Sequence, residues 1–323
     1  MKVLVADKFE KSGLDGLKSL GCEVVSEPDL QSDAIGARLV ETGAEILIVR
    51  GTKVPESAMA GTKAKLIIRA GSGYNTIDVD AASRMGIQVA NCPGKNAQAV
   101  AELAFGLILA CDRHIPDNVA DLRAGRWNKK AYSKARGLYG RTLGLIGMGQ
   151  VGREMVDRAK AFGMLVLAFT QHLPDDEVRA LGAEKVGSLA ELASRSDVVS
   201  VHVSLRPDTK AMLGEAFFSF LRPGAIFVNT SRGEVVDQSA LLAAVESGGL
   251  LAGLDVFDNE PTTGEGEYDG PLRSAKGVYC THHIGAATEQ AQEAVAAETV
   301  RIVAEFMRTG VAPNVVNLVA AGV

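Results

Sequence analysis

The sequence predicts an α/β protein whose two halves are each built around a parallel sheet. Short apolar runs of strand length alternate with segments of helical period from one end of the chain to the other. Alternation of this kind produces parallel sheets with helices on both faces. The length of 323 residues corresponds to about two domains of ordinary size.

The first half contains five predicted strands. They are KVLVA (2–6), EVV (23–25), ILIV (46–49), LIIRA (66–70) and IQVAN (87–91). Helical stretches between them, such as 32–43, end at a glycine, as helix C-termini commonly do. We expect one long helix from Asn96 to about Ile115, with Asn96 as its N-cap. Residues 121–140 are polar and without a clear period, and we expect them to form a connection.

The second half, from Arg141, contains six further runs. They are TLGLIG (142–147), MLVLAF (164–169), DVVSVHV (197–203), AIFVNT (225–230), LAGLDVF (251–257) and GVYCT (277–281). Near-continuous Val, Leu, Ile and Ala are typical of buried parallel strands, because helices cover both of their faces. A last helix is expected from about Thr288 to Thr309, ending at Gly310.

Composition excludes several classes of protein. A net charge of −5 and a pI near 5.7 argue against a surface for nucleic acid or for anionic membranes. The first ten residues include charged side chains, unlike a signal peptide, and no apolar run approaches the ~20 residues that span a bilayer. The four cysteines are far apart, which fits reduced thiols in a cytoplasm and offers no metal cluster. We therefore expect a cytoplasmic protein without a metal site.

The stretch LGLIGMGQVG (143–152) places Gly147, Gly149 and Gly152 in a G-x-G-x-x-G pattern. The pattern alone is weak, but here an apolar strand precedes it and an amphipathic helix follows it. That setting is the one a dinucleotide-binding loop requires. Gly147 allows the tight turn, Gly149 lets backbone approach a pyrophosphate, and Gly152 lets helix and strand pack closely. The helix N-terminus then offers N–H groups to the phosphates; the alternative is a glycine-rich turn without a ligand.

A dinucleotide loop of this kind also expects an acidic residue about 20 positions on, which accepts the adenosine ribose hydroxyls. The predicted second strand ends in LAFTQHL, so that position is Thr170. The nucleotide assignment stands, whereas the choice between NAD and NADP is weakened. We expect NAD, with NADP accepted to some degree.

Polar residues follow the predicted strands of the second half, at the edge where parallel sheets bind ligands. After the glycine loop they are Thr170, His202–Val203, Thr230–Ser231–Arg232, Asp255 and His282–His283. We expect them to converge on one edge.

This set of side chains fits carbonyl reduction. A histidine can supply the proton to the developing alkoxide, and Glu260 is the leading carboxylate partner for it. Arg232 is suited to gripping a substrate carboxylate, and the carboxylate of Asp255 could accept from a nicotinamide carboxamide. Adjacent side chains of an extended segment point to opposite sides, so one of His282 and His283 faces the cleft. Sequence physics leaves open which one.

Taken together, the motifs resemble those of the D-isomer-specific 2-hydroxyacid dehydrogenases over nearly the whole chain. LGLIGMGQVGREM, VNTSRGEVVDQSALLAA, GLDVFDNEP and HIGAAT follow one another in the family's order and at the expected separations. The resemblance implies Arg232, Glu260 and His283 as the catalytic set, with His282 as a structural neighbour. It implies hydride transfer between nicotinamide and C2 of a D-2-hydroxyacid or 2-oxoacid.

The resemblance also implies a fold of two Rossmann-like or flavodoxin-like domains, with the NAD(P)-binding domain (98–287) inserted into the substrate domain (1–97 and 288–323). The active site would lie in the cleft between them, and family members are usually homodimers. Ser72 and Gly73 would lie on a turn that binds the substrate carboxylate. The implied cofactor-binding residues are Ser72, Gly147, Gly149, Gln150, Val151, Gly152, Thr170, Val203, Thr230, Ser231, Arg232, Asp255, His283 and Gly285.

Within the family, VRGTKV, IIRAGSGYNTIDV, NCPGKNAQAVAEL and GRW most resemble the D-3-phosphoglycerate dehydrogenases. Four cations, Arg50, Lys53, Arg69 and Lys95, lie at or just past strand ends of the first half. They predict a site for a phosphorylated acid, with Arg50, Arg69 and Arg232 as substrate-binding residues, or else they are ordinary solvated charge. The alternatives are a glyoxylate or hydroxypyruvate reductase and a nucleotide sensor without turnover. A C-terminal serine-sensing domain is not expected.

Overall fold

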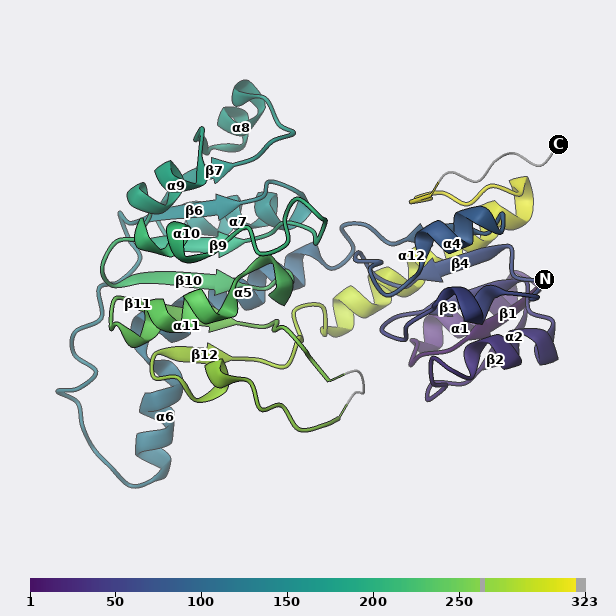
Figure 1. Ribbon diagram of the computed structural model, residues 1–323, viewed down its shortest axis with the longest axis horizontal. Helices are drawn as coiled ribbons and strands as arrows, with labels where there is room; N and C mark the ends of the chain where they lie inside the picture. The colour runs from purple at the N-terminus through teal and green to yellow at the C-terminus, as the bar shows by residue number, and fades with distance from the viewer. Residues whose placement is uncertain (262–264, 318–323) are drawn as a thin grey trace. The chain divides into compact units, whose positions relative to one another are not determined.

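The computed structural model of the chain describes residues 1–261 and 265–317 (Figure 1). The chain divides into two compact units, each with its own parallel sheet. Unit 1 comprises Met1–Asn96 and Ala287–Val323, and unit 2 comprises Ala97–Ala286. Unit 2 therefore occupies the middle of the sequence, between the two parts of unit 1. The predicted class, two parallel-sheet α/β domains, is confirmed.

Unit 1 is a five-stranded sheet in the order β2-β1-β3-β4-β5. Its strands are β1 (Lys2–Val5), β2 (Glu23–Ser26), β3 (Ile46–Val49), β4 (Leu66–Arg69) and β5 (Gln88–Asn91), all paired in parallel. Its helices are α1 (Lys11–Ser19), α2 (Ile35–Thr42), α3 (Glu56–Met59), α4 (Val79–Arg84) and α12 (Glu289–Thr309). The strand order reverses between β1 and β3, which is where open sheets of this kind bind ligands.

Helices cover both faces of the unit 1 sheet. Leu17 of α1 and Ile302 and Phe306 of α12 pack on one face, in a cluster with alternate residues of the strands. Leu39 of α2 and Met59 of α3 belong to the cluster on the other face. Strands buried on both sides explain why the sequence shows near-continuous apolar runs there.

The segment after α12 returns to the edge of the unit 1 sheet. Thr288 is the N-cap of α12, where its side chain accepts from the backbone N–H of Ala291, and Gly310 ends the helix with a φ of 76°. Val315 then forms an antiparallel bridge with Ala90, so β5 has a neighbour on its outer side. The end of the described chain thereby supports the last strand of the sheet.

Unit 2 is a seven-stranded parallel sheet in the order β12-β11-β10-β9-β6-β7-β8. Its strands are β6 (Thr142–Ile146), β7 (Leu165–Phe169), β8 (Glu184–Lys185), β9 (Val198–Val201), β10 (Ala225–Asn229), β11 (Leu250–Leu254) and β12 (Val278–Cys280). The order reverses between β6 and β9. β10, β11 and β12 are consecutive neighbours, so the segments that follow them meet at one edge.

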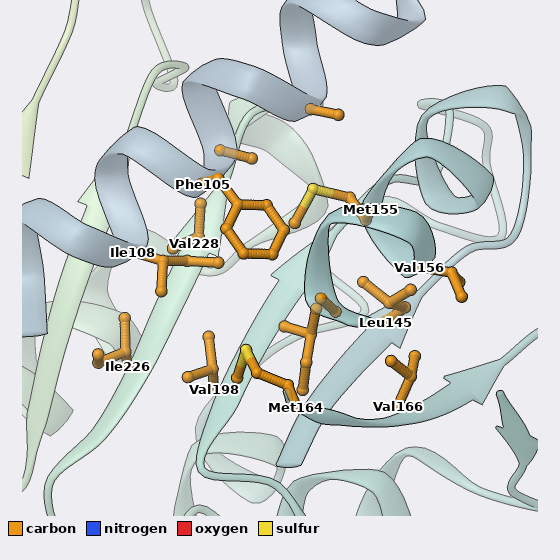
Figure 2. Close-up of a cluster of buried hydrophobic side chains, with 14 of the residues drawn as sticks. Phe105, Ile108, Leu145, Met155, Val156, Met164, Val166, Val198, Ile226 and Val228 are labelled. Carbon is orange, nitrogen blue, oxygen red and sulfur yellow. The ribbon is translucent and has the colours of Figure 1, made fainter. Parts of the chain in front are cut away.

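The helices of unit 2 also form two layers. They are α5 (Ala97–Arg113), α6 (Ile115–Arg123), α7 (Gln150–Ala161), α8 (Asp175–Leu181), α9 (Leu189–Arg195), α10 (Glu215–Ser219) and α11 (Gln238–Glu246), with 3-10 turns η1 (Gly233–Val235) and η2 (Pro271–Ser274). Figure 2 shows one layer, where Phe105 and Ile108 of α5 and Met155 of α7 pack over Leu145 and Val228 of the sheet. Side chains from α9, α10 and α11 belong to a second cluster. The glycine loop between β6 and α7 therefore rests on a packed core.

The long predicted helix ends earlier than its periodicity indicates, and a second helix follows it. His114 has a φ of 50°, which interrupts α5, and Pro116 then lies in the first turn of α6, where its missing N–H is tolerated. The predicted connection of 121–140 therefore starts inside α6. The two-residue strand β8 was not predicted, because Glu184–Lys185 is short and polar.

Candidate active site

The glycine loop has the steric properties that its pattern predicts. Gly147 has a φ of 100°, and a Cβ there would lie 2.6 Å from the carbonyl oxygen of His202. A Cβ at Gly152 would overlap the carbonyl oxygen of Gly147, so only glycine lets α7 start this close to the strand. A Cβ at Gly149, in contrast, would meet no atom within 4 Å. The loop is thus tight on its protein side and open at Gly149.

This loop fits the diphosphate of a dinucleotide. α7 begins at Gln150 and runs for 12 residues, and no side chain caps its start. The first backbone N–H groups, those of Gln150 and Val151, and the positive end of the helix dipole therefore remain for an anion. The space beside Gly149 gives a phosphate access to them. The residues present fit the cofactor that the sequence predicts.

Thr170 directly follows β7, next to the glycine loop. The carbonyl oxygen of Phe169, just before it, accepts from the backbone N–H of Gly147 at 3.0 Å. Thr170 is half-buried, and His172 is exposed. The side chain of Lys185, on the neighbouring strand β8, reaches the segment that follows Thr170. Its Nζ donates to the carbonyl of Leu173 (2.8 Å) and pairs with Asp175 (3.2 Å). The charge of Lys185 is therefore already paired with the carboxylate of Asp175.

Arg232 lies on a turn that Asn229 holds in place. Asn229 ends β10 and is 1% exposed; its amide donates to the carbonyl of Arg232 (2.9 Å), and its Oδ1 accepts from the backbone N–H (2.9 Å) and hydroxyl (2.8 Å) of Ser231. Nη1 of Arg232 donates to the carbonyl of Ser231 at 2.6 Å. Sequence reasoning missed Asn229. The available signal was an Asn that ends a buried apolar strand, since buried polar groups need partners.

Glu260 lies on the loop after β11 and joins two parts of the site. Its Oε1 accepts from the backbone N–H of Phe257 (2.8 Å), and its Oε2 lies 2.7 Å from Nδ1 of His283. The loop also packs closely on the Arg232 turn, because a Cβ at Gly233 would overlap the carbonyl of Phe257 and lie 2.5 Å from the nitrogen of Asp258. Only glycine at 233 allows these two backbones to approach so closely.

His283 lies on a turn that the buried carboxylate of Asp255 holds. Asp255 is 1% exposed, and its Oδ1 accepts from Oγ1 of Thr281 (2.6 Å) and the N–H of Ile284 (2.9 Å), while its Oδ2 accepts from the N–H of Gly285 (2.8 Å). His283 has a φ of 51°, so the chain is not extended at this point. The structure thus gives Asp255 a role within the chain, and its role toward a nicotinamide stays a prediction.

The structure places His283 in hydrogen-bond contact with Glu260. The alternation of side chains along the sequence could not choose between His282 and His283. A carboxylate only accepts hydrogen bonds, so Nδ1 of His283 carries a proton toward Glu260. Nε2 is then the nitrogen that can exchange a proton with a ligand. The His283 side chain is 48% exposed and therefore accessible to one.

Opposing effects set the charges of the site. Burial raises the pKa of Glu260, but the hydrogen bond and charge of His283, the N–H of Phe257 and the charge of Arg232 outweigh it, so that this pKa lies below its ordinary value. Burial lowers the pKa of Arg232, while the charges of Glu234 and Glu260 oppose that shift. A carboxylate ligand would bind this partly buried guanidinium through charge-assisted hydrogen bonds, which are stronger than neutral ones.

The remaining cofactor candidates of unit 2 lie on the same edge of the sheet. Val203 follows β9, Thr230 and Ser231 follow β10, and Gly285 is part of the His283 turn. His202 lies beside the glycine loop, but burial lowers its pKa to about 3, and its Nε2 lies 2.8 Å from the hydroxyl of Ser200. His202 is therefore a neutral structural side chain.

In unit 1, Arg50 lies where the strand order reverses. The carboxylate of Asp7, just past β1, accepts from the backbone N–H groups of Arg50 (2.5 Å), Gly51 (3.2 Å) and Thr52 (3.2 Å), which fixes the turn after β3. Nη1 of Arg50 lies 3.5 Å from Oε1 of Gln292 on α12. Asp7 had no signal of its own in the sequence beyond its place after a strand.

Arg69 ends β4, which is the neighbour of β3, so Arg50 and Arg69 share one edge of the unit 1 sheet. The turn with Ser72 and Gly73 follows. Gly71 has a φ of 148°, and a Cβ there would overlap the guanidinium of Arg69. Lys95, another of the four predicted cations, pairs with Glu298 of α12 at 3.5 Å, which fits a structural role.

The chain is similar to known proteins in both sequence and structure. The sequence profile described as "D-isomer specific 2-hydroxyacid dehydrogenase, NAD binding domain" matches residues 105–285. Two curated relatives are similar over nearly the whole chain. A D-3-phosphoglycerate dehydrogenase of Methanocaldococcus jannaschii is 37% identical, covering 98% of this chain and 60% of its own length. A hydroxypyruvate reductase of Thermotoga maritima is 40% identical, covering 93% of this chain and 96% of its own.

A solved structure is similar as well. An NAD+-bound 3-phosphoglycerate dehydrogenase of Entamoeba histolytica superimposes with a TM-score of 0.83 at 26% identity, covering 99% of each chain. The chain belongs to the D-isomer specific 2-hydroxyacid dehydrogenase family. The predicted family is confirmed. The chain spans about 60% of the length of the M. jannaschii relative.

Across residues 1–261 and 265–317, none of the helices combines the length and the apolarity that a bilayer crossing requires. The cytoplasmic location stays a prediction.

Proposed function

We propose that the chain is an NAD-dependent dehydrogenase that interconverts a D-2-hydroxyacid and its 2-oxoacid. The observation that supports this most is the hydrogen-bonded pair of Glu260 and His283. Glu260 follows β11 and His283 follows β12, while Arg232 follows the neighbouring strand β10. A proton donor, its anionic partner and a partly buried cation thus follow three consecutive strands. The glycine loop opens at the same sheet edge.

Each of the three side chains has a distinct task. Arg232 binds and orients the carboxylate of the substrate, helped by a guanidinium that has lost much of its water. His283 gives a proton from Nε2 to the carbonyl oxygen in reduction and takes it back in oxidation. Glu260 holds the ring through Nδ1 and stabilises its protonated form. A bound nicotinamide supplies or accepts the hydride.

For the substrate, we propose 3-phosphoglycerate and its 2-oxo form. Arg50 and Arg69 support this, because both lie at one edge of the unit 1 sheet beside the Ser72–Gly73 turn. Cations in addition to a carboxylate-binding arginine are what a phosphorylated acid requires. Relatives named D-3-phosphoglycerate dehydrogenase, at 34–37% identity, support the same substrate.

A second candidate is a hydroxypyruvate or glyoxylate reductase. The specific observation that favours it is the T. maritima hydroxypyruvate reductase, which is 40% identical and matches along 96% of its own length. A small unphosphorylated acid needs Arg232 but has no need of Arg50 and Arg69.

A substrate panel tests both candidates. The measurement is NADH oxidation with phosphohydroxypyruvate, hydroxypyruvate and glyoxylate, and NAD reduction with 3-phosphoglycerate and D-glycerate. We expect 3-phosphoglycerate to be preferred over D-glycerate and Arg50→Gln to shrink that preference. Equal activity on the two acids would favour the reductase, and the absence of turnover on all five would refute the dehydrogenase.

We also propose NAD as the preferred cofactor, with weak discrimination against NADP. Thr170 can accept one ribose hydrogen bond but cannot repel a 2′-phosphate, and Lys185 nearby is engaged by Asp175. Thr170→Asp should lower kcat/KM for NADPH by about tenfold or more, because a carboxylate repels the phosphate. Thr170→Val is the matched control, since it keeps the shape and adds no charge. A strong NADP preference in the unmodified chain would contradict this proposal.

A homodimer is the quaternary structure we propose. None of the nine residues of α6 is buried, and Ile115 (46%), Val119 (41%) and Leu122 (53%) expose an apolar stripe at i, i+4 and i+7. α6 projects from the body of unit 2 in Figure 1. An exposed apolar helix of this kind gains stability when a second copy covers it.

A further inference from the structure

The turn after β4 is tied to β5, the next strand of the unit 1 sheet. The backbone N–H of Cys92 donates to the carbonyl of Gly71 (2.9 Å), and the side-chain amide of Asn91 donates to the carbonyl of Ser72 (2.6 Å). Ser72 in turn donates its hydroxyl to Oδ1 of Asn96 (2.7 Å). Asn91 is 8% exposed, so its hydrogen bond is largely shielded from water. The conformation of the turn therefore depends on a buried side chain outside it.

Asn91 is itself held from its other side by the segment that follows α12. The backbone N–H of Asn91 donates to the carbonyl of Asn314 (3.4 Å), and the amide of Asn314 donates back to the carbonyl of Asn91 (3.3 Å). Asn314 has a φ of 58°, a conformation that asparagine tolerates better than most residues. The exchange of two hydrogen bonds fixes the position of Asn91 at the end of β5.

The chain of hydrogen bonds ends on a buried carboxylate of α12. Nδ2 of Asn314 donates to Oε1 of Glu298 at 2.8 Å, and Glu298 also receives two hydrogen bonds from Arg301 (3.0 and 2.6 Å). The hydrogen bonds from Arg301 are the main cause that lowers the pKa of Glu298 to about 2, against the opposing effect of burial. Glu298 is therefore a permanent anion at neutral pH, which anchors Asn314 in a single orientation.

We propose that Asn91 is a positioning residue for substrate binding, which sets the backbone of the Ser72–Gly73 turn and is itself oriented by Asn314 and Glu298. The inference rests on the proposed function and on the family resemblance, which implies that the backbone amides of this turn bind the substrate carboxylate in addition to Arg232. Loss of the Asn91 amide leaves the carbonyl of Ser72 without this donor and releases the turn. The backbone amides of the Ser72–Gly73 turn then lose their fixed orientation. Substrate affinity therefore falls, whereas the proton donor His283 is unaffected.

Asn91→Ala is the primary test, and Asn317→Ala is its matched control. Asn317 is also a buried asparagine of the same sheet edge, but it bonds the backbone of Val89 and Ile87 at the other end of β5. We expect Asn91→Ala to raise the KM for the 2-oxoacid by about tenfold, with kcat and the KM for NADH near their original values. Asn317→Ala should lower the melting temperature without changing the KM for the 2-oxoacid.

Asn314→Gly is a second variant that keeps the fold intact. Glycine adopts the same positive φ, so only the amide side chain that links Asn91 to Glu298 is removed. It should raise the KM for the 2-oxoacid in the same direction as Asn91→Ala, and by less. Hydrogen exchange of the peptide that spans 71–75 should be faster in both variants than in Asn317→Ala.

The outcomes separate this inference from the proposed function. An unchanged KM for the 2-oxoacid in Asn91→Ala, with a melting temperature lowered as in Asn317→Ala, would overturn the positioning role and leave the dehydrogenase in place. If the unmodified chain turned over no 2-oxoacid, the proposed function would fail. Hydrogen exchange alone would then decide whether Asn91 positions the turn. Faster exchange at 71–75 in Asn91→Ala would then support the positioning of the turn, and equal exchange would overturn it.

Discussion

At the scale of single residues, His283 is distinguished from the adjacent His282 by its hydrogen bond to Glu260. Nδ1 of His283 meets Glu260 at 2.7 Å, which leaves Nε2 for the substrate. His283→Ala should therefore reduce kcat by about 10²- to 10⁴-fold, because it removes the proton donor. NADH binding, measured by fluorescence titration, should stay close to that of the unmodified chain. His282→Ala is the control, and a larger loss of kcat in that variant would reverse the assignment.

Glu260 sets the pH range in which His283 can act. The pKa of Glu260 lies below its ordinary value, so Glu260 is anionic at neutral pH and stabilises a protonated imidazole. Reduction needs the protonated ring and is lost as pH rises. Glu260→Gln removes the anion, so this loss should occur at a lower pH than in the unmodified chain. The pH profile of kcat for reduction measures it, and an unchanged profile would exclude Glu260 from the mechanism.

At the scale of elements, the site depends on how closely the segments after β10 and β11 pack. Gly233→Ala places a methyl group against the carbonyl of Phe257 and 2.5 Å from the nitrogen of Asp258, so these segments must separate. A displacement of about 1 Å between Arg232 and Glu260 should lower kcat/KM by about 100-fold. The melting temperature should fall as well.

Gly106→Ala is the control for that substitution. Gly106 is exposed on α5, and a Cβ there meets no atom within 4 Å. Alanine in an exposed helix interior should stabilise the chain by about 0.5–1 kcal/mol and leave kcat/KM unchanged. Normal kinetics in Gly233→Ala would show that the packing of the two segments does not control the chemistry.

At the scale of the whole molecule, α6 predicts self-association. Light scattering after gel filtration should give about twice the chain mass of 33.9 kDa. Leu122→Asp, which places a charge in the apolar stripe, should shift the protein to the monomer. Val40→Asp is the control, because Val40 is a comparably exposed (59%) apolar residue on α2 of unit 1. A monomeric unmodified chain at tens of micromolar would refute the dimer.

The sequence by itself determined the strands, the class of fold and the glycine loop. Period and composition are local properties, and the predicted apolar runs coincide within a residue or two with ten of the twelve strands in residues 1–261 and 265–317. β8 is too short and polar to show the pattern, and the predicted run at β11 extends three residues past Leu254. Gly147 and Gly152 were predictable because their requirement arises within one strand–turn–helix unit. The break at His114 was not, since a positive φ in a non-glycine residue depends on its surroundings.

Only the tertiary structure decided which polar side chains hold the site together. The sequence does not show which groups Asn229, Asp255 and Asn91 bind. In the structure, each hydrogen-bonds the backbone of a nearby turn. The choice of His283 over His282 follows from a φ of 51° and from the distance to Glu260, which lies 23 positions away in the chain. Hydrogen bonds between such distant segments depend on strand order and register, and local pattern carries no information about either.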